Sequence, residues 1–248
     1  MQQLDFKRIL FFDIETVSQK PIFADLPDSF QYQWARKSKF ILRKYEEEVS
    51  DEEIAQAYED RAAIYAEFGK IVCISMAYLA MQEGQEELRV KSIAVDDEFK
   101  LLEEFKVILT QYFFDPKKHF LCGHNAKEFD IPYICRRMVI HGMPLPEMLD
   151  ITGKKPWETE YMLDTMNMWK FGDHKNFTSL DLLANSLGIQ TPKDDIDGSE
   201  VGRVYWKEQD LPRIARYCEK DVVTVAQVLR KFTFLPLFTE PQIKFVTE

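Results

Sequence analysis

The segment 211–232 predicts a long amphipathic helix that carries a carboxylate on its apolar side. At about 100° per residue, its apolar side chains fall on one stripe, formed by Ile214, Cys218, Val222, Val225, Val228, Leu229 and Phe232. Asp221 lies in the middle of this stripe, and Tyr217 lies one turn earlier on the same face. An ionised carboxylate turned toward a core is costly unless a cation or strong hydrogen bonds meet it. An arginine or backbone donors could satisfy Asp221, but they leave Tyr217 unexplained.

A second pair of carboxylates lies on a predicted strand. In RILFFDIE at 8–15, a two-residue period places Asp13 and Glu15 on one face with Ile9 and Phe11, while Leu10, Phe12 and Ile14 share the other. Two acids at a strand end are weak evidence by themselves, since most such pairs are ordinary. Because these acids share their face with apolar side chains, we expect them at the edge of buried surface.

A third segment, GHNAKEFDIPYICRR at 123–137, places Asp130 between a predicted strand and a predicted helix. Aspartate is a favoured N-cap, so capping alone could explain it, and capping is also compatible with metal binding.

Three segments thus bring carboxylates to an interior or a cleft. Like charges raise one another's pKa and destabilise a fold unless divalent cations lie among them. All-oxygen ligands favour Mg²⁺ or Mn²⁺, and a pair of such ions about 3.5–4 Å apart suits in-line displacement at phosphorus.

The composition sets wider limits. A chain of 248 residues with 46% hydrophobic content predicts one domain over 1–248. It has no apolar run of about 20 residues and no secretory signal at the amino terminus, so we expect a soluble, cytoplasmic protein. Its cysteines form no CxxC pair and are expected to be reduced. The net charge of −10 disfavours a broad duplex-binding surface, but an enzyme that holds a few nucleotides at a chain end remains compatible with it.

The order of predicted elements is strands, helix, strand, helix, with a helical insertion near the start. The insertion spans about 18–70, and Ser50 with Glu53 forms a capping-box pattern inside it. A hairpin turn is expected around Gly84. The region 142–177 is rich in loop-forming residues, with a short strand around 161–169. The remaining elements are strands at 70–79, 88–95 and 119–123 and helices at 98–113, from Asp130 onward, at 178–188 and at 211–232.

The three acidic segments resemble a known family. FFDIET, HNAKEFD and YCEKD resemble the first, second and third motifs of the DEDD 3′→5′ exonucleases, in the form found in the proofreading domains of family-B DNA polymerases. The order of the motifs and the pattern between them agree across about 9–232. Tyr217 stands four positions before Asp221, and Arg216 stands where the histidine branch has its histidine, so the chain resembles the tyrosine branch, DEDDy. The resemblance implies an α/β, ribonuclease-H-like fold, a mixed sheet flanked by helices.

The resemblance also implies roles for the acids. Asp13, Glu15 and Asp221 would hold the catalytic metal, Asp13 would bridge to a second ion, and Asp130 would support that second site directly or through water. Tyr217 would orient the attacking water, since a phenol with a pKa of about 10 is a poor base at neutral pH. Two Mg²⁺ or Mn²⁺ ions per site are therefore the expected cofactors, and the metal is expected to activate the water.

The implied substrate is the 3′ end of a nucleic acid. Single-stranded DNA is favoured over RNA, and the product would be a nucleoside 5′-monophosphate. Thr16, Asn125 and Phe129 match motif positions that line the substrate, and Phe129 could stack on a base. Local packing and capping explain these three residues equally well.

The sequence departs from the proofreading domains in two respects. It carries no polymerase domain after the third motif, so we expect a stand-alone relative that does not proofread in cis. The insertion is longer than such a domain needs, and in QYQWARKSKFILRKY at 31–45 aromatic residues alternate with cations: Trp34, Phe40 and two tyrosines with Arg36, Lys37, Lys39, Arg43 and Lys44. This mixture suits a single strand of nucleic acid, but an amphipathic helix packed on the domain is an equally good interpretation.

Three other functions compete with a DNA exonuclease. An inactive nucleic-acid-binding module with the same fold would lack at least one of the carboxylates, and all of them are present. An RNA-trimming exonuclease of the same branch would differ only in how the site treats a 2′-hydroxyl, and the sequence does not distinguish it. A regulatory scaffold with surface acids is disfavoured by the core-facing position of Asp221.

Overall fold

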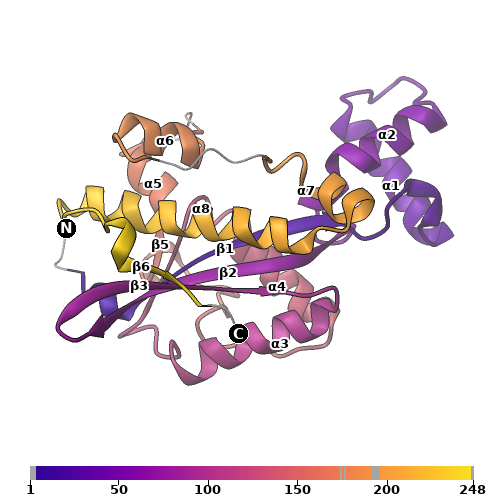
Figure 1. Cartoon of the computed structure of the whole chain (residues 1–248). Coiled ribbons are helices and arrows are strands. Elements are labelled where there is room, and N and C mark those ends of the chain that lie inside the picture. The colour runs from indigo at the N-terminus through magenta and orange to yellow at the C-terminus, as the bar shows by residue number, and fades with distance from the viewer. Residues whose placement is uncertain (1–3, 174, 176, 191–195, 247–248) are drawn as a thin grey trace.

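The computed structural model describes residues 4–173, 175, 177–190 and 196–246, and its centre is a six-stranded mixed sheet (Figure 1). The strand order is β5-β4-β1-β2-β3-β6. β1, β2 and β3 form an antiparallel meander, β4 and β5 run parallel to β1, and β6 runs parallel to β3. The bounds are β1 (Ile9–Ser18), β2 (Gly69–Gln82), β3 (Gln85–Ala94), β4 (Phe120–Gly123), β5 (Met162–Asp164) and β6 (Ile243–Phe245). This sheet confirms the predicted α/β class.

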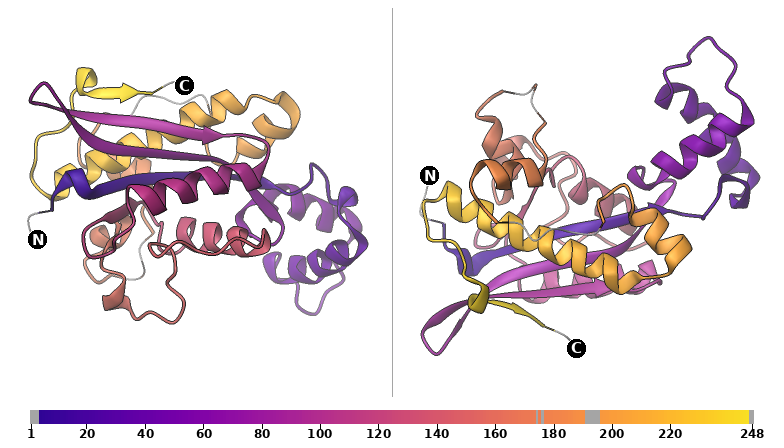
Figure 2. Two further views of the ribbon diagram at one scale, coloured as in Figure 1. Left: turned by 90° about the horizontal axis from the view of Figure 1, so that it is seen from below. Right: turned by 45° about the horizontal axis from the view of Figure 1, so that its top comes forward.

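Central strand β1 is buried on both faces, as its alternating apolar residues predict. Phe11 packs with Val222 and Val225 of α8 (Leu211–Phe232), while Phe12 packs with Phe105 of α3 (Glu98–Gln111). α3 and α4 (Asp130–Ile140) cover one face of the sheet, and α8 covers the other (Figure 2). The predicted bounds of α8 agree with the structure at both ends.

The β2–β3 hairpin is longer than predicted. The strands continue through the polar residues that we assigned to the turn and leave a two-residue turn at Glu83 and Gly84. Both of these residues have positive φ, 51° and 82°, which a tight hairpin turn of this length requires. The end of the hairpin near the turn is exposed, so the two strands pair there without apolar side chains. The hydrophobic pattern therefore predicted strands that are shorter than the observed ones.

The region 142–177 contains less strand than predicted. β5 ends at Asp164, and α5 (Thr165–Lys170) follows directly because the Asp164 carboxylate caps its first turn. Residues 174 and 176 of this region lie outside the described residues. α6 (Leu180–Ser186) begins after its N-cap Ser179 and packs on α8, as Leu183 and Val228 show.

Several short elements were not predicted. They include α7 (Val201–Arg203), a π-helical turn (Val204–Glu208) and β6. Each is only three to five residues long, which is too short for a hydrophobic period to show in the sequence. Among the described residues, no helix is both long and apolar enough to cross a bilayer.

The helical insertion is confirmed between the end of β1 and the start of β2. It contains α1 (Asp28–Ile41) and α2 (Asp51–Arg61), and Ser50 and Glu53 form the predicted capping box at the start of α2. The two helices enclose a small core of their own around Trp34 and Tyr58, whose rings meet edge to face at 5.4 Å. The insertion lies beyond the end of the sheet to which β1 runs (Figure 1).

Candidate active site

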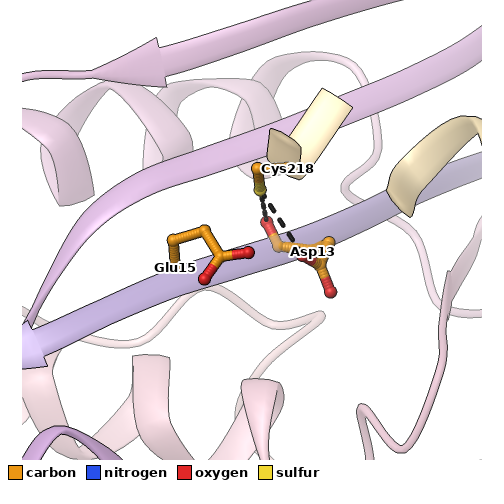
Figure 3. Close-up of side chains that lie close together, drawn as sticks. All are labelled: Asp13, Glu15 and Cys218. Carbon is orange, nitrogen blue, oxygen red and sulfur yellow. Dashed lines mark hydrogen bonds between the residues drawn. The ribbon is translucent and has the colours of Figure 1, made fainter. Parts of the chain in front are cut away.

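Asp13 and Glu15 lie on the face of β1 that α8 covers. Glu15 is only 8% exposed and Asp13 is partly buried. Their side chains lie beside Cys218 of α8, whose thiol donates to the Asp13 carboxylate over 3.4 Å (Figure 3). This placement confirms the expectation that the two acids lie at the edge of buried surface.

Asp130 is brought to the same strand from the opposite side. It is the first residue of α4 and is 3% exposed, and its Oδ1 accepts a hydrogen bond of 3.2 Å from the backbone N–H of Ile14. The N-cap of α4 is Phe129, which makes no side-chain cap, so the alternative that Asp130 is an N-cap is wrong. The helix begins at Asp130 as predicted, and the carboxylate of this residue accepts from β1.

Tyr217 and Asp221 approach the acids from α8. A hydrogen bond joins the Tyr217 hydroxyl to Asp221, one turn along the helix. Burial raises the pKa of Tyr217 well above 10, and the charges of Asp221, Glu15 and Asp13 raise it further. The phenol therefore remains protonated across the physiological range and faces the carboxylates as a hydrogen-bond donor.

Burial is the main cause of the raised pKa values of these carboxyl groups, and neighbouring charges add to it. Burial raises the pKa of Asp13 most, followed by the charges of Asp130 and Asp221, and the Cys218 hydrogen bond lowers it only in part. Burial also raises the pKa of Glu15, with Asp13 and Asp221 adding to the effect. Burial raises the pKa of Asp130 to about 7. Carboxyl groups with shifts in this direction are poised to lose their protons when a cation binds.

The donor set fits a divalent metal ion. One ligand atom each from Asp13, Glu15 and Cys218 lies within 4.8 Å of the others, and Asp130 and Asp221 are close enough to change the pKa of Asp13. Burial raises the pKa of the Cys218 thiol, so at neutral pH this residue is a thiol that holds Asp13 rather than a thiolate ligand. The remaining donors are carboxylate oxygens, which suit Mg²⁺ or Mn²⁺.

Two of the three predicted substrate residues meet around one tyrosine. The rings of Phe129 and Tyr133 lie 5.5 Å apart, and Thr16 is hydrogen-bonded to the Tyr133 hydroxyl. Asn125 lies in the loop before Phe129 with φ at 59°, and its buried Oδ1 has no partner among the described residues. An unsatisfied buried carbonyl in a strained loop is a feature of ligand sites.

Asp164 is a structural residue of the site that we did not predict. It is 2% exposed and accepts hydrogen bonds from the backbone N–H groups of Asn125 and Lys127 over 3.1 and 3.0 Å. It also caps α5 through two further N–H groups. The loop that leads to Asp130 is thus fixed to the end of β5. The available signal was an aspartate directly after a short apolar run and directly before a helix, which predicts an N-cap but not its long-range partners.

Comparison with known proteins identifies a family. A family described as a predicted 3′-5′ exonuclease related to the exonuclease domain of PolB matches residues 64–236, well over half of the chain. The match includes Asp130, Tyr217 and Asp221, whereas β1 and most of the insertion precede it. No curated protein matches the sequence.

Proposed function

Because the chain belongs to the family of predicted 3′-5′ exonucleases related to the exonuclease domain of PolB, we propose that it is a metal-dependent exonuclease of the DEDDy type. Its substrate is the 3′ end of single-stranded DNA, and its product is a nucleoside 5′-monophosphate. The observation that supports this proposal most strongly is the convergence of Asp13, Glu15, Asp130 and Asp221, from three distant segments, on one partly buried place.

In this proposal the four carboxylates bind metal ions and Tyr217 orients the attacking water. Asp13, Glu15 and Asp221 would hold one divalent ion, and Asp13 with Asp130 would hold a second. When bound, such ions supply Lewis-acid activation of the attacking water and neutralise charge that develops on the phosphate. Tyr217 is fixed by the hydrogen bond that its protonated hydroxyl donates to Asp221, and its oxygen orients the water by accepting a hydrogen bond from it. Positioning of this kind converts an encounter into an aligned attack.

The residues around Tyr133 contact the terminal nucleotides. Phe129 offers its ring to a base, and base–aromatic stacking contributes about 1–3 kcal/mol. The Asn125 side chain supplies a polar group with unused capacity beside it. Thr16 continues this surface from β1. Because a ring can stack only on a base that is not paired in a duplex, these groups favour a single strand.

The test is degradation of a 5′-labelled single strand by purified protein in Mg²⁺ or Mn²⁺. We expect stepwise shortening from the 3′ end, with nucleoside 5′-monophosphate released, and loss of this activity in EDTA and in Asp13→Ala. Glu104→Ala, an exposed acid on α3, is the matched control and should retain full activity. A circular single strand should remain intact. Undiminished cleavage by Asp13→Ala would overturn the proposal.

The same assay decides between DNA and RNA. Strands of equal sequence in the two chemistries are compared by kcat/KM, because the two substrates differ only by the 2′-hydroxyl. A higher value for DNA supports the proposal, whereas a higher value for RNA would make the chain an RNA-trimming exonuclease with the same catalytic residues.

A further inference from the structure

Helix α1 of the insertion is basic although the protein is acidic. Between Asp28 and Lys44 the chain has five lysine and arginine residues and one acidic residue, while its net charge is −10. The same stretch exposes large aromatic side chains, with Tyr32 at 62% and Phe40 at 67%. Scattered exposed apolar residues are ordinary, but a helix that exposes aromatic rings among cations is a surface for a ligand with both flat and anionic parts.

The packing of α1 separates its structural residues from its exposed ones. Trp34 is fully buried, and its indole N–H donates to the carbonyl of Ile54 in α2. Trp34 therefore cannot stack on a base. The hypothesis that the 31–45 stretch binds a single strand included Trp34 among its aromatic residues, and for this residue it is wrong. Lys44 is engaged by Glu53 at 2.6 Å. The side of α1 opposite to Trp34 carries Arg36 and Phe40, and both of these residues are exposed.

A groove of about 550 Å³ runs along this side of α1. Its walls are formed by α1 and the residues just before β2, and it is lined by Ser29, Phe30, Gln33, Arg36, Lys37, Phe40, Glu67 and Phe68. Its lining includes two cations, one acid, and the exposed rings of Phe30 and Phe40. The groove thus combines rings with positive charge.

The groove lies next to the predicted substrate surface. Phe129 contacts Tyr133, and the Tyr133 hydroxyl donates to the carbonyl of Ala63 over 2.8 Å. Ala63 belongs to the short turn that leads into the groove wall at Phe68. Five residues of β1 separate Asp13 from the insertion, which corresponds to about 17 Å of strand. A nucleic acid strand that leaves the acids past Phe129 therefore reaches α1 within a few nucleotides.

We propose that the α1 groove, through Arg36, Lys37, Phe30 and Phe40, binds the single strand a few nucleotides upstream of the 3′ end that the acids cleave. This inference rests on the proposed exonuclease function. The cations contact backbone phosphates and the rings stack on bases, so the affinity for the strand does not depend on its sequence. The overall negative charge elsewhere keeps the strand from binding across the rest of the surface. The enzyme consequently holds longer strands more tightly than short ones.

The test compares the double variant Arg36→Ala/Phe40→Ala with the wild type on a series of single strands of increasing length. A matched control, Phe114→Ala/Lys117→Ala, removes one exposed ring and one exposed cation from the loop after α3, away from the groove. For each protein, kcat and KM are measured at each length, and the far-ultraviolet circular dichroism confirms that the variants are folded. None of these residues contacts the acids, so kcat should not change.

The expected result is that KM of the wild type and of the control falls with length and then levels off. In the double variant KM should stay at its short-strand value, which makes it about 10-fold higher than the wild type on long strands, since one stacked base and one phosphate contact are lost. A KM of the wild type that does not vary with length, or a double variant that changes KM equally at all lengths or at none, overturns the inference. Absence of any degradation by the wild type instead overturns the proposed function.

Discussion

Asp130 accepts a hydrogen bond from the backbone N–H of Ile14, although 116 residues separate the two. Ile14 lies between the two acids of β1, so this bond fixes the start of α4 at the height of Asp13 and Glu15. A backbone donor on a central strand cannot move without breaking the sheet. The position of Asp130 relative to Asp13 and Glu15 is therefore fixed by the backbone of β1.

The metal-free protein is expected to lose stability as pH rises from about 4 to about 7. The pKa of an aspartate is about 3.9 in the unfolded chain and that of Asp130 is about 7 in the fold, so in this window the folded state holds a proton that the unfolded chain has released. Its contribution to stability is present at the low end and lost at the high end, by a few kcal/mol. Asp13 and Glu15 act in the same direction.

Urea denaturation in EDTA at several pH values measures this slope. Asp130→Asn should flatten it, because the amide does not titrate, and added Mg²⁺ should restore stability at the upper end of the range. A metal-free protein that became more stable between about pH 5 and about pH 7, with no effect of Asp130→Asn, would contradict the raised pKa of the buried Asp130.

Tyr217→Phe should lower kcat by about 100-fold and leave KM nearly unchanged, because the hydroxyl positions the water and not the substrate. The pKa of Tyr217 lies far above the assay range, so the pH profile of kcat should keep its shape in the variant. The measurement is kcat and KM against pH for both proteins. An increase of kcat with pH that disappears in Tyr217→Phe would show instead that the deprotonated phenol acts as a base.

Arg137→Met should destabilise the fold by about 3–5 kcal/mol. Arg137 is buried and pairs with the buried Glu98, which also accepts from the backbone N–H of Ile71. Its loss leaves the buried Glu98 carboxylate between α3, α4 and β2 with only His141 and the Ile71 N–H as partners. The neighbouring Arg136 is exposed, so Arg136→Met should change stability by less than about 0.5 kcal/mol. Equal free energies of unfolding for the two variants in urea would refute the stabilising role of the Arg137–Glu98 pair.

Asp164→Ala should weaken both the fold and the substrate site. Its carboxylate binds the loop through Asn125 and Lys127, so we expect a loss of about 2–4 kcal/mol together with a higher KM. Asp97→Ala removes the exposed N-cap of α3 and should cost only about 1 kcal/mol without changing KM. Denaturation and steady-state kinetics of both variants make the comparison. An unchanged KM in Asp164→Ala would show that the loop holds its shape without it.

Local periodicity was enough to predict the elements that hold the acids. The stripe on α8 and the alternation on β1 follow directly from which side chains must be buried, and both are found as predicted. The structure also explains why Asp221 can lie in an apolar stripe: it is only partly buried and is hydrogen-bonded to Tyr217. The roles of these residues in catalysis remain predictions that the kinetic experiments address.

Interactions between distant segments could not be predicted. Asp164 looks like a local helix cap, and only the folded chain shows its bonds to the β4–α4 loop. Trp34 was assigned to a basic, aromatic surface, but its large ring fills the core between α1 and α2 instead. β6 has three residues and pairs with β3 through backbone hydrogen bonds that leave little trace in side-chain type.

The most direct test of the central claim is Mn²⁺ binding to the purified protein, followed by electron paramagnetic resonance of the free ion. The four carboxylates should bind two Mn²⁺ ions per chain, and Asp13→Asn, which removes the acid expected to bridge both ions, should weaken the binding of both. Binding should also raise the melting temperature of the wild type and not that of the variant. A wild type that binds no Mn²⁺, or binding that Asp13→Asn leaves unchanged, would contradict a shared metal site.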